Sequence, residues 1–282
     1  MLSKTLKQDM RATLPLWLFL SAIALCASFI FGISLREVIF AETEIGIVFG
    51  VLGIYLAIAI FSGYSIATVI FVGIRFYRNF YTDEGYLTFT LPVKRSTLFF
   101  SKVLSGTIFL VGTTLVVITS LILALLMVPS SIQDSTPVLF EVMEFLWSML
   151  RSIFESASDT VTMITMLTLS LLILFCLMLF EILALYFCIT IGSVITKKLK
   201  VLAAIGCYYA LNFAIGTISS IAQIFLMLLT EDIALVVMAL SPTQLSLVVI
   251  FLLVCVLGFM MLLTSALYYA SEKLIEKKLN LP

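Results

Sequence analysis

Long runs of apolar residues alternate along the chain with short segments that carry its charged and polar side chains. A helix needs about 20 apolar residues to cross the hydrocarbon core of a bilayer, and six of the runs reach this length. Several runs exceed it, which indicates tilted helices or helices that extend beyond the bilayer. The pattern predicts transmembrane helices at Leu14–Ser34, Ile45–Ile74, Val103–Val128, Val161–Ile195, Val201–Leu229 and Leu247–Ala270.

The composition agrees with a chain that is dissolved in lipid. Of the 282 residues, 62% are hydrophobic and 11% are charged, and the mean hydropathy is +1.24. Soluble domains are closer to about half apolar and about a quarter charged. We therefore expect a single all-α membrane domain over residues 1–282. The formal net charge is zero, which gives no electrostatic reason to expect nucleic acid as a partner.

Basic residues predict the orientation of the spans, because the cytoplasmic segments of membrane proteins carry most of the lysine and arginine. The alternate, outer connections hold only Arg36 and Arg151 of the sixteen basic residues. The others lie in the termini and in the second and fourth connections, at Lys4, Lys7, Arg11, Arg75, Arg78, Lys94, Arg95, Lys102, Lys197, Lys198, Lys200, Lys273, Lys277 and Lys278. Both termini are therefore expected in the cytoplasm. The outer face is rich in acids, and these form either a solvated rim or a surface that attracts cationic solutes.

Apolar residues at the N-terminus repeat every fourth position, and basic residues surround them. This spacing predicts a short helix that lies on the inner leaflet before the chain turns into the first span. The alternative is an ordinary positively charged flank. The apolar repeat consists of Leu2, Leu6, Met10 and Leu14.

The outer connection from Pro129 to Thr160 is longer than a turn requires. Its polar residues recur at a spacing that places them on one side of a helix, and apolar residues cover the rest. We expect an amphipathic helix at the outer interface, which serves either as a structural lid or as a substrate gate. The residues that mark this helix are Glu141, Glu144, Trp147 and Arg151.

The cytoplasmic connection from Arg75 to Lys102 is aromatic and basic, and it contains the acidic pair Asp83 and Glu84. Thr82 is suited to cap a short helix whose first turn holds these acids, where the helix dipole favours them. Pro92 is expected to end that helix. An apolar cluster on a short cytoplasmic helix needs either a partner or a membrane surface to cover it, and the residue pattern alone leaves both open.

This connection resembles the first cytoplasmic loop of bacterial ABC-2-type transporter permeases. The resemblance rests on Asp83-Glu84-Gly85-Tyr86-Leu87-Thr88, on Leu91-Pro92-Val93 and on Ser101-Lys102. The C-terminal Lys278-Leu279-Asn280-Leu281 and the arrangement of six spans after an N-terminal interfacial helix are also similar to that family. The motif covers about a tenth of the chain, whereas the similarity in topology extends over all of it.

The resemblance implies a transport subunit of the bacterial plasma membrane. Such permeases pair as homodimers or heterodimers, and each subunit binds a separate cytoplasmic ATPase that holds ATP and magnesium. The short helix after the second span would then be the coupling helix that contacts the ATPase. The resemblance would place Tyr81, Asp83, Glu84, Tyr86 and Leu87 at or near that contact.

One feature departs from the family. Its best-known members carry their large outer insertion between the fifth and sixth spans. Here the corresponding connection, Thr230 to Ser246, is shorter than the connection between the third and fourth spans. The family's substrate path and outer gate are therefore not carried over to this chain.

Glu181 is the one acidic or basic residue deep inside a span. An ionised side chain there costs about 2.5–3.5 kcal/mol on insertion scales, so we expect it to face the bundle and to be paired or protonated. With Asn212 it is a candidate for a substrate path, and a purely structural polar contact is the alternative. The expected hydrogen-bond partners are Tyr208, Tyr209, Asn212 and Gln223.

Small residues in the spans are expected to serve packing. Gly46, Gly50 and Gly53 allow another helix to approach the second span closely. The five cysteines all fall in apolar runs without paired motifs, so they are expected to be small packing residues rather than disulfides or metal ligands.

The resemblance, together with the apolar interior, favours the permease of an ATP-driven exporter of a hydrophobic or amphipathic substrate, such as a peptide or a lipid. The chain has no GxxxxGK[ST] phosphate loop, so its energy would come from a partner. A channel or ion-coupled carrier is the alternative, although such carriers usually hold several buried ionisable groups. An intramembrane enzyme is disfavoured because histidine is absent and Glu181 is the one buried acid. No catalytic residue and no metal site are expected.

Overall fold

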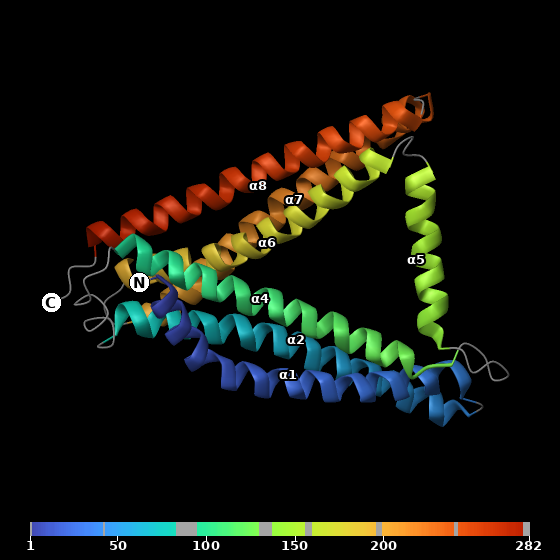
Figure 1. The fold of residues 1–282 in the computed structure, drawn as a ribbon, viewed down its shortest axis with the longest axis horizontal. Helices are drawn as coiled ribbons and strands as arrows, with labels where there is room; N and C mark the ends of the chain where they lie inside the picture. Colours follow the sequence, from blue (N-terminus) through green and yellow to red (C-terminus); the bar gives the residue numbers. More distant parts are fainter. Residues whose placement is uncertain are drawn as a thin grey trace. The chain divides into compact units, whose positions relative to one another are not determined.

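The computed structural model describes residues 2–41, 43–82, 95–129, 137–155, 160–195, 199–239 and 242–278. Within these ranges the chain forms seven α-helices and no strand (Figure 1). The helices are α1 (Leu2–Phe40), α2 (Glu44–Tyr81), α4 (Arg95–Leu126), α5 (Val138–Glu155), α6 (Thr160–Ile195), α7 (Lys200–Ala239) and α8 (Pro242–Lys278).

Six of the described helices are long and apolar enough to cross a membrane, which confirms the six predicted spans and a multi-pass membrane protein. All except α5 belong to this group. The candidate spans are Thr5–Phe40, Glu44–Tyr81, Arg95–Leu126, Val161–Ile195, Lys200–Ile221 and Ser246–Ile275. The orientation of the termini and the expectation of one domain over the whole chain stay predictions.

Several helices run further than the apolar pattern suggested. Helix α2 ends at Tyr81 rather than Ile74, and α7 continues to Ala239. The connection expected from Thr230 to Ser246 is largely helical, since only residues 240–241 separate α7 from α8, and the next candidate span begins at Ser246. Charged residues end the apolar run but do not interrupt a backbone hydrogen-bond ladder. The new helix begins at Pro242, and proline suits a first turn because its missing N–H has no intrahelical partner there.

The N-terminal segment is helical but is not a separate helix. Helix α1 is continuous from Leu2 to Phe40 and contains Pro15. Figure 1 shows that the first part of α1 runs at an angle to the remainder. Proline removes one backbone hydrogen bond and its ring presses on the preceding turn, which bends a helix. The expected change of direction is thus present within one helix rather than between two.

Helix α5 confirms the helix expected in the third connection, and it covers Val138 to Glu155. The N–H of Val138 donates to the carbonyl of Val128 at 2.7 Å. Pro129 and Pro137 form an isolated bridge beside this contact. These contacts tie the start of α5 to the residues that follow α4.

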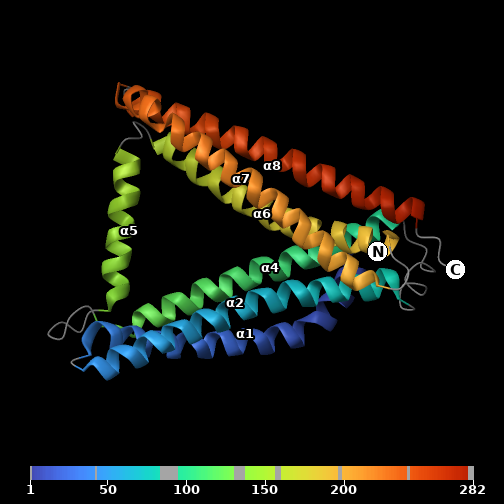
Figure 2. The same ribbon diagram turned by 180° about the vertical axis from the view of Figure 1, so that it is seen from behind.

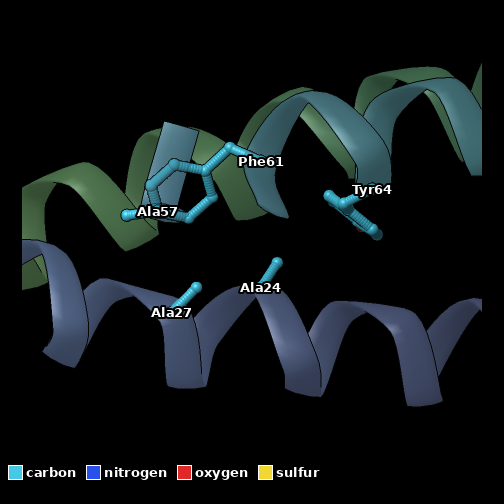
Figure 3. Close-up of a cluster of buried hydrophobic side chains, with 5 residues drawn as sticks. All are labelled: Ala24, Ala27, Ala57, Phe61 and Tyr64. Atoms are coloured by element: carbon cyan, nitrogen blue, oxygen red, sulfur yellow. The ribbon is translucent and has the colours of Figure 1, made fainter. Parts of the chain in front are cut away.

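The helices fall into two compact units, and the first comprises Met1–Ile74 and Leu104–Leu150. Figure 3 shows part of its core, where small side chains of α1 face an aromatic pair on α2. Hydroxyl contacts add to this packing, since Ser21 Oγ lies 2.8 Å from Tyr64 Oη and the indole of Trp17 donates to Thr113 at 3.1 Å. The core residues are Ala24, Ala27, Ala57, Phe61 and Tyr64.

Glycines on α2 let α1 approach closely, as the sequence predicted. A Cβ added at Gly50 would lie 2.9 Å from the carbonyl oxygen of Ser34, and one added at Gly53 would lie 3.0 Å from the Cβ of Ser34. A Cβ at Gly46 would meet that of Ala41 at 2.9 Å. All three glycines therefore serve contacts within the first unit.

The second unit comprises Arg75–Val103 and Arg151–Pro282. In it α6 packs against both α7 and α8, and both ribbon views show these three helices side by side (Figures 1 and 2). Gly192 of α6 allows the tightest approach, because an added Cβ would lie 2.5 Å from the backbone nitrogen of Ala204 on α7. The last turns of α2 and the first turns of α4 also belong to this unit.

Candidate functional site

An aromatic cluster in the second unit joins the two helix ends that frame residues 83–94. It consists of Phe76 and Phe80 from α2, Phe99 from α4 and Tyr186 from α6, and we call it the loop-flank cluster. Each of these side chains is at most 1% exposed. The rings of Phe76 and Tyr186 stack at 4.0 Å with an interplanar angle of 12°. Phe99 meets both of these rings edge-on, at 6.1 and 6.3 Å.

Polar contacts attach the same two helix ends to α6. The hydroxyl of Tyr186 donates to the backbone carbonyl of Lys102 at 3.1 Å, and this tyrosine is buried. The hydroxyl of Tyr81 donates to Thr190 Oγ1 at 3.1 Å. Thr190 in turn donates to the carbonyl of Tyr186 at 2.7 Å. Because Tyr186 and Thr190 lie one helical turn apart, a single face of α6 holds the end of α2 and the start of α4.

Tyr81, expected at the contact with an ATPase, is engaged within its own chain through Thr190 and is only partly exposed. Thr82 donates its hydroxyl back to the carbonyl of Arg78 at 2.6 Å, at the end of α2. The other residues of the expected coupling contact lie outside the described part of the chain. These are Asp83, Glu84, Tyr86 and Leu87. Their role stays a prediction.

Glu181 of α6 is half-buried and faces α7, where the hydroxyl of Tyr208 donates to its carboxylate. Of the four expected partners, Tyr208 makes the direct contact. Asn212 does not reach the carboxylate, and its amide instead donates to the backbone carbonyl of Tyr208 at 3.0 Å. The side chains of Tyr209 and Gln223 are exposed. Among the described residues, Tyr208 gives the acid a hydrogen-bond donor, which is the kind of partner that a buried carboxyl needs.

Helix α5 carries apolar side chains and acidic side chains that are both exposed. Glu141, Glu144 and Trp147 are exposed, and Trp147 is 61% exposed. The neighbouring apolar side chains Phe140 and Phe145 are exposed to a similar extent. The side chain of Arg151 lies outside the part of the chain that the structure describes. An exposed amphipathic helix of this kind is compatible with an interfacial position.

The sequence did not identify Tyr186 or Thr190. Both lie inside a long apolar span, where a tyrosine followed four residues later by a threonine has no distinctive pattern. The signal that could have drawn attention to them is the concentration of aromatic residues at Arg75–Lys102, because such a cluster needs a partner surface. Which helix supplies that surface depends on tertiary packing.

Among the described residues, no group of histidine, cysteine, aspartate or glutamate side chains could hold a metal ion. All five cysteines are free, and Cys176 and Cys188 are buried in α6. Burial of these two agrees with the packing role expected of the cysteines, whereas Cys26 and Cys255 are exposed.

Comparison with known proteins does not assign the chain to a family. No family model, no characterised protein and no solved structure matches it.

Proposed function

We propose that this protein is the permease subunit of an ATP-driven exporter of the bacterial plasma membrane. In this proposal a separate cytoplasmic ATPase binds ATP and magnesium and acts on the loop between the second and third spans. A second copy of the chain, or a paired homologous permease, completes the transporter. The substrate is a hydrophobic or amphipathic molecule such as a peptide or a lipid.

The observation that carries this proposal is the anchorage of both loop flanks on α6. A loop that receives force from a partner needs flanks that do not yield. Here the rings of Phe76 and Phe99 contact Tyr186 of α6, and two hydrogen bonds add to this attachment. The family-like motif lies between these flanks, at Asp83 to Val93. Six candidate spans in a chain without a phosphate loop are also consistent with a transport subunit driven by a partner.

The second candidate is a channel or an ion-coupled carrier that works without an ATPase. Glu181 favours it, since acids inside membranes often bind ions or protons. The carboxylate has a single described side-chain donor, Tyr208. A carrier usually concentrates several ionisable groups around such a site, so this candidate ranks below the exporter.

The proposal is tested by replacing the expected docking residues. Interfaces concentrate their binding energy in a few apolar or aromatic anchors, so Tyr86→Ala with Leu87→Ala should abolish binding of an ATPase or uncouple its hydrolysis. The affinity-tagged chain is purified from native membranes, and the ATP-hydrolysing subunit that co-purifies with it is identified. Binding of this subunit is then measured by pull-down at matched expression, together with its ATP hydrolysis.

The control for this experiment is Tyr269→Ala. Tyr269 lies on α8, is 57% exposed, and its ring lies beneath the ammonium group of Lys273. This variant should bind the ATPase normally. An intact complex with full hydrolysis in the Tyr86/Leu87 double variant would remove the docking role. Recovery of active transport without any ATP-hydrolysing subunit would favour the carrier.

A further inference from the structure

We propose that α6 carries displacements of the loop flanks to the Glu181–Tyr208 contact, and that Tyr186 is the positioning residue that fixes the flanks to α6. The proposal deepens the proposed function and, for its transport consequence, rests on it. It concerns only described residues of the second unit. It assigns a role to Tyr186 and Thr190, which no sequence motif indicated.

The first step is the junction between the flanks and α6. Tyr186 contacts both flanks, because its ring stacks on Phe76 of α2 and its hydroxyl bonds to the Lys102 carbonyl of α4. Thr190, one turn further along α6, receives the hydrogen bond of Tyr81. The two flanks therefore share one attachment surface. A movement of either flank that leaves α6 behind must break a ring stack or a buried hydrogen bond.

The second step runs along α6 itself. Glu181 precedes Tyr186 by five residues, which corresponds to a rise of about 7.5 Å and a rotation of about 140° around the helix axis. The attachment surface and Glu181 thus face different neighbours from one short helical segment. No proline interrupts α6 between Thr160 and Ile195, so its backbone hydrogen bonds make this segment a stiff connection.

The third step is the contact with α7. Tyr208 donates to Glu181, and one turn later Asn212 donates to the carbonyl of Tyr208. On the same pair of helices, Gly192 lies so close to Ala204 that an added Cβ would come within 2.7 Å of its Cα. Because the backbones already touch there, a rotation or shift of α6 cannot be absorbed by side-chain adjustment. We therefore expect any movement of α6 relative to α7 to alter the contact between Glu181 and Tyr208.

The rigid attachment is tested on the isolated chain in nanodiscs, without an ATPase. Spin labels are placed at Phe100→Cys on α4 and Ile195→Cys on α6, which are 46% and 65% exposed. The five native cysteines are replaced by alanine. We expect a narrow distance distribution by pulsed electron paramagnetic resonance, a clearly broader one in Tyr186→Leu, and an intermediate width in Tyr186→Phe, which keeps the ring. The matched control Tyr269→Leu should leave the width unchanged.

The transmission is tested by a double-mutant cycle with the co-purifying ATPase. The affinity of the ATPase for the chain is measured with and without the non-hydrolysable analogue AMP-PNP. The ratio of these two affinities is compared between the wild-type chain and Glu181→Gln. We expect Glu181→Gln to change this ratio by about fivefold or more, in line with typical allosteric couplings. In a Tyr186→Leu background the same substitution should change the ratio by less than about twofold.

The outcomes separate this inference from the proposed function. If wild-type chain binds no ATPase, the proposed function fails, and the distance measurement alone decides whether Tyr186 fixes the flanks. If the ATPase binds but Glu181→Gln acts equally in the wild-type and Tyr186→Leu backgrounds, transmission through α6 is overturned while the function stands. Should Tyr186→Leu fail to fold, Thr190→Val replaces it, because it keeps the side-chain shape and removes the hydroxyl that accepts from Tyr81 and donates to the Tyr186 carbonyl. An unchanged distance distribution in all variants would overturn the positioning role of Tyr186.

Discussion

Glycines show how the environment of a single residue decides its importance in this protein. Gly192 touches the backbone of Ala204, whereas Gly206, on the partner helix α7, has open space where a Cβ would lie. Both are helical and both sit in apolar sequence. Helix propensity alone would rate Gly→Ala as favourable at both positions, by about 1 kcal/mol. Only the contact across the helix pair separates them.

Gly192→Ala should therefore destabilise the protein by about 1–3 kcal/mol, the usual cost of forcing extra volume into a packed contact. Gly206→Ala should be neutral or slightly stabilising. Thermal unfolding in detergent, followed by the loss of monodisperse protein in size-exclusion chromatography, compares the two variants directly. Equal midpoints would mean that α6 and α7 do not approach as closely as the structure shows.

Glu181 is the residue at which structural and functional roles can be separated. We expect Glu181→Gln to fold at least as well as the wild type, because the amide keeps a hydrogen bond with Tyr208 while the cost of a charge in lipid disappears. If the carboxylate takes part in transport, the variant loses substrate export at unchanged expression. Normal export in reconstituted vesicles would leave Glu181 with a structural role only.

Helix α5 is an element that the sequence predicted as an amphipathic helix at an interface. Its polar and apolar residues alternate at helical spacing, and the structure confirms a helix over Val138–Glu155. The exposed Trp147 and Phe145 cannot remain in water without cost, since burial of a large aromatic side chain contributes about 1.5–3 kcal/mol. A position among lipid headgroups would cover the apolar side chains and keep Glu141 and Glu144 hydrated.

The depth of α5 is measured by tryptophan fluorescence, because the chain contains only two tryptophans, Trp17 and Trp147. In Trp17→Phe, the emission of Trp147 should be quenched most strongly by lipids brominated near the headgroup and less by lipids brominated near the chain ends. Trp147→Phe provides the comparison, with Trp17 partly buried and bonded to Thr113 on α4. Failure of every brominated lipid to quench Trp147 would place α5 against protein or in water.

On the scale of the whole molecule, the sequence predicts the orientation of the six candidate spans in the membrane. Fourteen of the sixteen basic residues fall in the termini and in the second and fourth connections. Lysine and arginine next to spans are retained on the cytoplasmic side during insertion. A distribution this uneven predicts that both termini face the cytoplasm.

Cysteine labelling of intact cells tests the orientation. In a variant that lacks the five native cysteines, Asp134→Cys should react with a membrane-impermeant maleimide from outside. Lys94→Cys should react only after the membrane is permeabilised. The reverse pattern would invert the topology, and it would also place the loop at 83–94 out of reach of any cytoplasmic ATPase.

The sequence by itself determined the features that depend on the solvent around the chain. A run of apolar side chains must be helical in lipid, since no water is available to satisfy its backbone groups, and the six candidate spans follow from this constraint. Helix α5 followed instead from the helical spacing of its polar residues. Element ends were less certain, as α2 and α7 show, because helices continue past the bilayer until the backbone ladder is interrupted. Tyr208 was among the expected hydrogen-bond partners of Glu181, because an acid inside a span needs a hydrogen-bond donor.

Tertiary structure alone decided which helix faces which. Tyr186 and Thr190 become notable only because the ends of α2 and α4 meet α6 there. Gly192 differs from Gly206 only because Ala204 lies against it. In a span where nearly every residue is apolar, hydrophobicity does not distinguish one face of a helix from another. The choice between faces is then made by ring stacking, close backbone approach and a few buried hydrogen bonds, which arise between residues far apart in the sequence.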